Sequence, residues 1–255
     1  MIFDTHGHYD DPAFNVDRDV LLGSFVDNEI ELVMNVGASI ESSKTTIALT
    51  EKYPFIYGAV GVHPCETMEL NEEQFQWLAT QCKKDKILAI GEIGLDYYWE
   101  DVPRDIQQKW FSRQLELARA EQLPVIIHSR DAANDTYNMM KSAKAEQIGG
   151  VVHCYSYTKE MARQFLEMDF YFGIGGVITF TNAKKLKEAV EFIPLDKIVL
   201  ETDSPYLAPM PNRGKRNSAL NIPFIAKEIA SIKGITYDEV MEITFQNGKR
   251  LYRMK

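Results

Sequence analysis

The chain begins with Met1-Ile2-Phe3-Asp4-Thr5-His6-Gly7-His8, in which a short apolar run leads directly into two histidines two positions apart. On a β-strand, residues i and i+2 point to the same face, so we expect His6 and His8 side by side at the carboxyl end of a first strand. Two imidazoles at this spacing can bind one metal ion or support two. For the pair taken alone, a polar turn around Gly7 is the better interpretation, and the rest of the sequence decides between the two.

A short apolar, β-branched run followed by an amphipathic segment occurs eight times along the chain. The predicted strands are Met1–Thr5, Glu31–Val36, Ile56–Val62, Ile87–Glu92, Pro124–His128, Gly150–His153, Tyr171–Val177 and Ile198–Asp203. Nearly continuous apolar strands are typical of a parallel sheet that is buried on both faces. Eight βα units in a chain of 255 residues favour an α/β fold of the (β/α)8 TIM-barrel type, with a doubly wound open sheet as the alternative.

Helical periodicity accounts for most of the segments between these runs. The predicted helices are Phe14–Asp27, Glu41–Tyr53, Glu72–Cys82, Arg104–Glu121, Lys159–Glu167 and Ala183–Phe192. A loop rich in Pro, Arg and Lys follows the last strand, and two extra C-terminal helices are expected after it, over Pro223–Ser231 and from the capping box Thr236-x-x-Glu239. No linker or repeat interrupts the pattern, so we expect a single domain over residues 1–255.

Composition limits the classes of partner. The net charge is −9, and an acidic chain is a poor non-specific binder of duplex nucleic acid because that affinity comes mainly from Lys and Arg neutralising phosphates. The three cysteines are odd in number and form no CxxC, which fits a reducing compartment. We find no signal-peptide pattern and no long apolar run. The sequence therefore predicts a soluble, cytoplasmic protein with no membrane association and no obligate protein partner.

All five histidines lie at the carboxyl ends of predicted strands. A single histidine at such a place is usually structural, but five together, joined by two carboxylates, indicate a site on the face where barrel enzymes bind their substrates. The residues are His6, His8, His63, Glu92, His128, His153 and Asp203.

Six of these side chains form a coherent set of metal ligands. Imidazoles combined with carboxylates suit zinc, manganese or a similar divalent ion, and six ligands exceed the three that one catalytic zinc commonly takes. The predicted ligands of one or two divalent ions are His6, His8, Glu92, His128, His153 and Asp203. A bridging Glu92 between two ions ~3.5–4 Å apart would use the set economically.

Two carboxylates have further expected roles. Asp203 is the predicted general base, because it can hold a metal with one oxygen and accept a proton from water with the other. Glu92 is the second predicted catalytic residue. Glu201 shares the face of Asp203 and is expected to support the ligands from behind, with a purely structural interior carboxylate as an equally open interpretation.

Substrate contacts are predicted from cations and aromatic residues near the strand ends. Arg130 and the run Arg213-Gly214-Lys215-Arg216 are candidate phosphate contacts, although a solvated basic loop explains the run equally well. The aromatic run Tyr97-Tyr98-Trp99 could stack on bases or pack at the rim.

Seven stretches, in this order, resemble the TatD family of metal-dependent deoxyribonucleases, within the amidohydrolase-like barrels. They are Asp4–His8, Gly61–Pro64, Gly91–Tyr97, Pro124–Arg130, His153–Ser156, Glu201–Leu207 and Arg213–Asn217. The resemblance implies a (β/α)8 barrel and the six metal ligands named above, and it implies that His63 lies near the substrate. It also implies metal-dependent exonuclease activity, of the 3′–5′ type, on single-stranded DNA, and adds magnesium to zinc and manganese as a candidate ion.

The sequence therefore predicts a divalent-metal-dependent hydrolase. The first hypothesis is a deoxyribonuclease that cleaves phosphodiester bonds in single-stranded DNA by a metal-activated water, with RNA left open as a substrate. The alternative is an amide or ester hydrolase on the same barrel. A non-catalytic scaffold stabilised by metal is disfavoured, because a silent site need not keep a base at Asp203.

Overall fold

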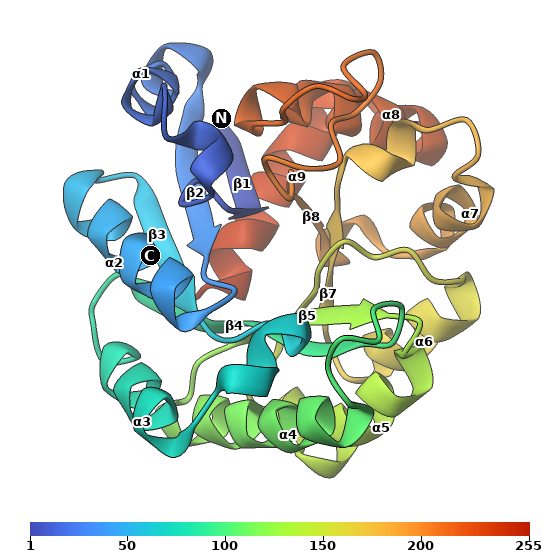
Figure 1. The fold of residues 1–255 in the computed structure, drawn as a ribbon. Helices are drawn as coiled ribbons and strands as arrows, with labels where there is room; N and C mark the ends of the chain where they lie inside the picture. The colour runs from blue at the N-terminus through green and yellow to red at the C-terminus, as the bar shows by residue number, and fades with distance from the viewer. The chain divides into compact units, whose positions relative to one another are not determined.

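The structure, a computed structural model, describes residues 1–255 and contains eight strands joined into one sheet. The strands are β1 (Ile2–Gly7), β2 (Ile30–Val36), β3 (Ile56–Val60), β4 (Ile87–Asp96), β5 (Val125–Arg130), β6 (Gly150–Val152), β7 (Tyr171–Ile174) and β8 (Ile198–Leu200). Their order in the sheet is the order in the sequence; Figure 1 labels all of them except β6. The predicted (β/α)8 barrel is confirmed.

Helices alternate with the strands. They are α1 (Arg18–Gly23), α2 (Ile40–Lys52), α3 (Glu72–Gln81), α4 (Arg104–Glu121), α5 (Ala133–Ser142), α6 (Lys159–Glu167), α7 (Lys184–Phe192), α8 (Ile222–Lys233) and α9 (Tyr237–Leu251). α9 begins at the predicted capping box, in which Thr236 and Glu239 satisfy each other's backbone N–H groups. None of the nine helices combines the length and the apolar character that crossing a membrane requires.

The residues form two compact units, each built from more than one stretch of the chain. The first comprises Met1–Asn35, Cys154–Arg163 and Tyr171–Lys255, and the second comprises Val36–His153 and Gln164–Phe170. The expected single domain over residues 1–255 stays a prediction.

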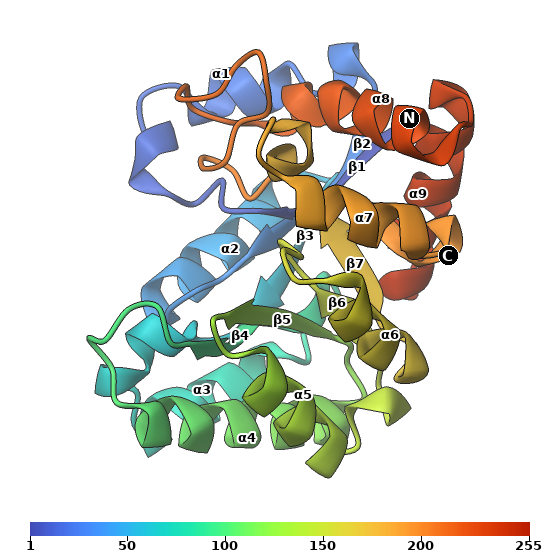
Figure 2. The same cartoon turned by 90° about the vertical axis from the view of Figure 1, so that its right-hand side faces the viewer.

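The first unit joins the beginning of the chain to its end. Gly7 of β1 forms a parallel bridge with Ser204, and the His8 amide donates to the Ser204 carbonyl at 2.8 Å. α9 packs against β1, β8 and α8, and Figure 2 shows α8 and α9 side by side. The first and last strands of the sheet are therefore neighbours, as a closed barrel requires.

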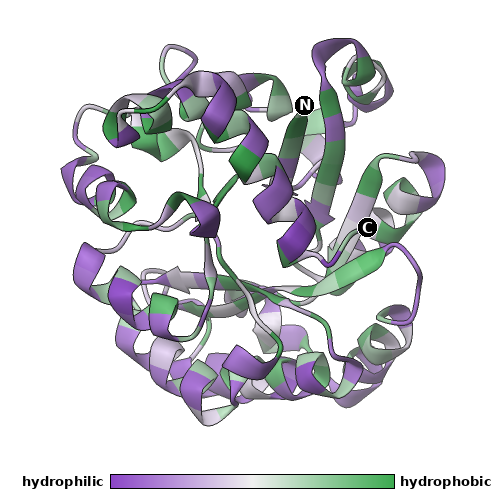
Figure 3. Cartoon of the chain, turned by 180° about the vertical axis from the view of Figure 1, so that it is seen from behind, coloured by the Kyte–Doolittle hydropathy of each residue, from purple (hydrophilic) through white to green (hydrophobic).

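The second unit is built around β4, which pairs in parallel with β3 and β5. α4 packs on β4, and its residues Trp110, Phe111 and Leu115 are all at most 3% exposed. This helix has the predicted bounds, because its apolar residues recur at helical spacing between Gln, Arg and Glu. Figure 3 shows the same contrast between strands and helices: the strands are mostly hydrophobic, whereas the helices mix hydrophilic and hydrophobic residues.

Several predicted boundaries are wrong. β4 continues past Glu92 to Asp96, whereas β7 ends at Ile174 and β8 at Leu200, so Asp203 lies in the segment after its strand. The predicted helix Phe14–Asp27 is reduced to α1 with short 3-10 turns on either side. α5 was not predicted, because its buried face consists only of Thr136 and Met140 and gives a weak apolar period.

The extension of β4 depends on Gly94, which pairs with His128 of β5. Its φ is +150°, and a Cβ there would lie 1.9 Å from the His128 carbonyl oxygen. Gly149 also has a positive φ, of +72°, but no atom lies within 4 Å of an added Cβ. An alanine at Gly94 would therefore meet both steric overlap and backbone strain, whereas an alanine at Gly149 would meet backbone strain alone.

We predict that Gly94→Ala lowers the free energy of unfolding by about 3 kcal/mol or more, because it adds overlap to strain. Gly149→Ala, the control, should cost only about 1–2 kcal/mol, the strain alone. Urea unfolding of both variants measures the difference. Equal losses would show that β4 does not need its close approach to β5.

Candidate metal centre

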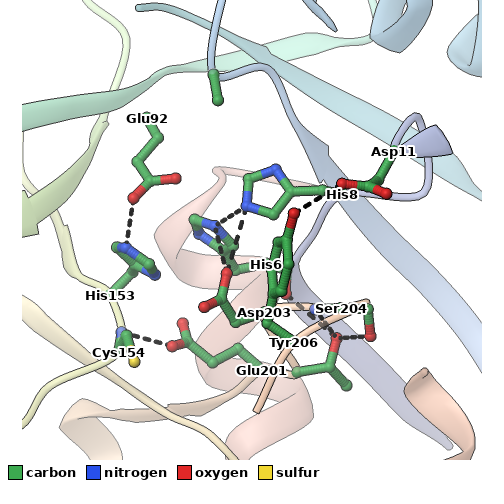
Figure 4. A network of polar contacts seen from close by, with 12 residues as sticks. His6, His8, Asp11, Glu92, His153, Cys154, Glu201, Asp203, Ser204 and Tyr206 are labelled. Atoms are coloured by element: carbon green, nitrogen blue, oxygen red, sulfur yellow. Dashed lines mark hydrogen bonds and ion pairs between the residues drawn. The ribbon is translucent and has the colours of Figure 1, made fainter. Parts of the chain in front are cut away.

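The first cluster of candidate ligands consists of His6, His8 and Asp203, all in the first unit. The His6 and His8 Nε2 atoms are 3.2 Å apart, and Asp203 Oδ1 lies 3.3 Å from His8 Nε2 and 3.7 Å from His6 Nε2. Figure 4 shows the three side chains pointing toward one another. His6 is fully buried, whereas the Asp203 side chain is 18% exposed, so solvent reaches the cluster at its carboxylate.

These spacings fit one ion. Ligand atoms ~2.0–2.2 Å from a tetrahedral ion are about 3.3–3.6 Å apart, close to the three separations in this cluster. Two neutral imidazole nitrogens and one carboxylate oxygen also match the donor set of a catalytic zinc or similar ion. The cluster therefore fits a divalent ion in both geometry and chemistry.

Backbone hydrogen bonds place Asp203 opposite the histidines. Its amide donates to the His6 carbonyl at 2.9 Å, and the amide of Thr202 donates to the same oxygen at 3.3 Å. Asp203 itself has a φ of +55°, a left-handed conformation that Asp tolerates better than most residues. Such conformations persist where the surroundings enforce them, often at functional sites.

Asp4 stands behind this cluster and was not predicted as a site residue. Its carboxylate accepts hydrogen bonds from the Thr202 hydroxyl at 2.8 Å and the Tyr9 hydroxyl at 2.9 Å. Complete burial raises the pKa of Asp4 to about 7, against the lowering effect of those hydrogen bonds. Asp4 therefore fixes the backbone that carries both His6 and Asp203.

The second cluster lies in the second unit and centres on Glu92. One oxygen, Oε1, lies 2.6 Å from His153 Nε2 and 2.8 Å from His128 Nδ1; Figure 4 shows the Glu92–His153 contact. Glu92 is 4% exposed and His153 is 5% exposed. A buried carboxylate with two imidazoles is again a donor set for a divalent ion.

Asp96 completes this cluster, although sequence reasoning assigned it no role. Its Oδ2 lies 2.9 Å from His128 Nε2. Burial alone would lower the pKa of His128, but hydrogen bonds to Asp96 and Glu92 raise it above its ordinary value. A carboxylate behind a ligating histidine fixes the ring and its tautomer. The spacing from Glu92 to Asp96 was a usable signal, since residues i and i+4 of a strand share a face.

His63 differs from the other histidines. Its Nδ1 accepts the amide of Cys65 at 3.2 Å, so the neutral ring carries its proton on Nε2, which lies 3.8 Å from Glu92 Oε1. Burial, helped by the nearby His128, lowers the pKa of His63 to about 3. The ring therefore offers a neutral N–H, a hydrogen-bond donor, where a metal ligand would offer a lone pair.

Cys65 also lies near these donors, in a group with His63 and Asp96. Burial raises the pKa of its thiol to about 12. A thiol must lose its proton to bind a metal, so Cys65 does not fit a ligand role.

Glu201 is a buried carboxylate that accepts the Cys154 amide at 2.5 Å, a contact drawn in Figure 4. Space for it comes from Gly173, where a Cβ would lie 2.0 Å from Glu201 Oε2. Glu201 therefore holds the backbone that directly follows His153, and its expected role in supporting the ligands stays a prediction.

The predicted phosphate contacts differ in their surroundings. Arg216 forms a bidentate ion pair with Asp17, with distances of 2.7 and 2.6 Å, and is already engaged in holding its loop. Arg213 stacks on Phe180, 4.4 Å from the ring centroid, and Lys215 is exposed. The predicted phosphate role of Arg216 is therefore less well supported than those of Arg213 and Lys215.

A metal site of this kind on a (β/α)8 barrel is typical of metal-dependent hydrolases. The model of the family described as TatD related DNase matches residues 3–253, and the chain belongs to this family. It is similar to the "Uncharacterized metal-dependent hydrolase YabD" of Bacillus subtilis (strain 168), with 40% identity over 254 residues that cover 100% of both chains.

Two further comparisons agree. The "Uncharacterized metal-dependent hydrolase YcfH" of Escherichia coli (strain K12) is 32% identical over 258 residues, covering 100% of this chain and 96% of that one. The crystal structure of YjjV, a TatD homologue from Escherichia coli K12, superimposes with a TM-score of 0.93 at 28% identity, covering 100% of this chain and 98% of that chain. The protein is a metal-dependent hydrolase of the TatD family.

We predict that His8→Ala loses metal without losing its fold. Affinity should fall more than about 100-fold, since even the loss of a group that only orients a ligand costs 10–100-fold. Titration of the metal-free protein with Zn²⁺ or Mn²⁺ measures this, and thermal unfolding without metal should match the parent. His63→Ala is the control and should keep its metal. Equal affinities of His8→Ala and the parent would contradict the first cluster.

For the second cluster, Asp96→Asn should weaken metal binding about 10–100-fold, because the amide no longer holds His128 as a carboxylate does. Asp135→Asn, which alters an exposed partner of Tyr97, is the matched control. Isothermal titration with Mn²⁺ compares the two. Unchanged binding in Asp96→Asn would show that Asp96 does not orient a ligand.

Proposed function

We propose that this hydrolase is a deoxyribonuclease that removes nucleotides from the 3′ end of single-stranded DNA. The observation that carries the proposal is the convergence of His6, His8 and Asp203, whose ligand atoms lie 3.2–3.7 Å apart. The description of the family as TatD related DNase supports the choice of a phosphodiester substrate.

We assign one divalent ion to each cluster. His6, His8 and Asp203 would hold the first, and Glu92, His128 and His153 would hold the second. Mg²⁺, Mn²⁺ and Zn²⁺ are the candidates, and the imidazole-rich donor set favours Mn²⁺ or Zn²⁺. When bound, such ions polarise a phosphodiester and acidify water.

The protein's own groups then move the protons. Asp203 is partly exposed, and in this proposal it accepts a proton from the attacking water as general base. The water oxygen bonds to phosphorus, the bond between phosphorus and the 3′ oxygen breaks, and the leaving oxygen takes up the proton that Asp203 then releases. The products are a 5′-mononucleotide and a strand shortened by one residue.

Several groups would hold the substrate. The Nε2–H of His63, whose side chain is 18% exposed, can donate to a phosphoryl oxygen. Arg130, Arg213 and Lys215 are exposed cations that can contact phosphates. With a net charge of −9, such local contacts suit a single strand, or RNA, better than the long backbone contacts of a duplex.

We predict that metal-loaded protein releases mononucleotides from a labelled single-stranded oligonucleotide, and that EDTA stops the reaction. Asp203→Asn should lower kcat by about 100-fold or more, since general-base catalysis contributes 10²–10⁴-fold. Gel analysis of strands labelled at either end gives both the rate and the polarity. Asp196→Asn, in the turn that precedes β8 and so at the other end of this strand from Asp203, should cleave like the parent.

The same preparation should be offered a panel of esters and amides. Turnover there with none on DNA would replace the proposal with an amide or ester hydrolase. Turnover on neither, with metal still raising the melting temperature, would favour a scaffold.

A further inference from the structure

We propose that Tyr98, Trp99 and Arg130 form a stacking platform for a nucleobase of a single-stranded substrate, an inference that rests on the proposed nuclease function. The three residues follow β4 or end β5, in the second unit. Tyr98 is 52% exposed and Trp99 is 51% exposed. Large aromatic side chains this exposed, and grouped, commonly mark a binding surface.

The group is ordered by its own contacts. The Tyr98 and Trp99 rings meet at 90° with centroids 4.9 Å apart, and the Arg130 guanidinium lies 3.8 Å from the Tyr98 centroid. No carboxylate pairs with Arg130. The platform therefore offers a half-exposed indole beside a cation that has no acidic partner.

Tyr97 does not belong to the platform. Its hydroxyl donates to Asp135 at 2.9 Å, and Arg104 covers its ring at 4.2 Å. The predicted aromatic run thus divides into one packed ring and two exposed rings. Packing explains Tyr97 and leaves Tyr98 and Trp99 unexplained.

Asp96 joins the platform to the second metal cluster. Its Oδ1 accepts the amides of Tyr98 at 3.0 Å and Trp99 at 3.2 Å. Its Oδ2 holds His128 Nε2 at 2.9 Å. One carboxylate therefore fixes both a candidate ligand and the backbone of the two rings, which places the platform beside the second cluster.

A base is the occupant that suits this surface. Every base presents a π face that stacks on an aromatic ring, and a duplex hides those faces in its own stack. The acidic chain gains little binding affinity from contacts with phosphates, so base stacking would provide much of its affinity for a single strand. Arg130 can contribute a cation–π contact or one phosphate contact.

The test compares two substrates with the same phosphodiesters, an oligothymidylate and an abasic oligomer that lacks bases. For Trp99→Ala, KM for oligothymidylate should rise roughly 5- to 150-fold, the range of a lost base–aromatic stack, while KM for the abasic oligomer stays at the parent value. Trp99→Phe should restore most of the loss. An equal change on both substrates, or none on either, overturns the platform.

The matched control is Trp77→Ala, a partly exposed tryptophan on α3 that has Lys44 5.8 Å from its ring. It should bind and cleave both oligomers like the parent. A loss in Trp77→Ala equal to that in Trp99→Ala would mean that the effect is general, and it would also overturn the proposal.

A binding measurement separates this inference from the proposed function. The chain has three tryptophans, and in EDTA oligothymidylate should quench the fluorescence of the parent and of Trp77→Phe, but not that of Trp99→Phe. If the parent cleaves no oligomer, the nuclease proposal fails, yet quenching that depends on Trp99 still upholds the platform. Cleavage without quenching overturns the platform alone.

Discussion

The hydrogen bonds between the end of β1 and the segment after β8 are the constraint on which the first metal cluster depends. The Asp203 amide reaches the His6 carbonyl at 2.9 Å, and the His8 amide reaches the Ser204 carbonyl at 2.8 Å. Residues from opposite ends of the sequence thereby present two imidazoles and a carboxylate at metal-ligand spacing. The cluster exists only where β1 and the segment after β8 lie together, because neither of them alone carries the complete donor set.

Two buried carboxylates behind the candidate ligands hold those ligands, or the backbone that carries them, in place. Asp4 ties the backbone of Thr202 to β1, and Asp96 faces His128. Burying such groups is expensive unless their hydrogen bonds are satisfied, and both carboxylates accept at least two. What each buried carboxylate contributes in return is a fixed position for a candidate ligand or for the backbone that carries it.

The sequence predicted the strand order, most helices and the histidines at strand ends. These features depend on the apolar period and on residue types within a short stretch of chain, both of which can be read directly from the sequence. It placed Glu92 at the end of a strand, because Gly91 and Glu92 interrupt the apolar run that begins at Ile87, whereas β4 runs on to Asp96. It gave Arg216 a phosphate role without anticipating Asp17, a partner 199 residues away in the sequence. It gave Asp4 no role, because nothing local shows that a carboxylate will be fully buried. The sequence did not predict these ion pairs and hydrogen bonds, because they join residues that lie far apart in the chain.

Anomalous diffraction from crystals of the manganese-loaded protein will show whether His6, His8 and Asp203 hold a divalent ion. We expect a peak ~2.0–2.3 Å from Nε2 of His6, Nε2 of His8 and a carboxylate oxygen of Asp203, with a second peak at Glu92, His128 and His153. Manganese bound at other side chains, with no peak at His6 and His8, would contradict it.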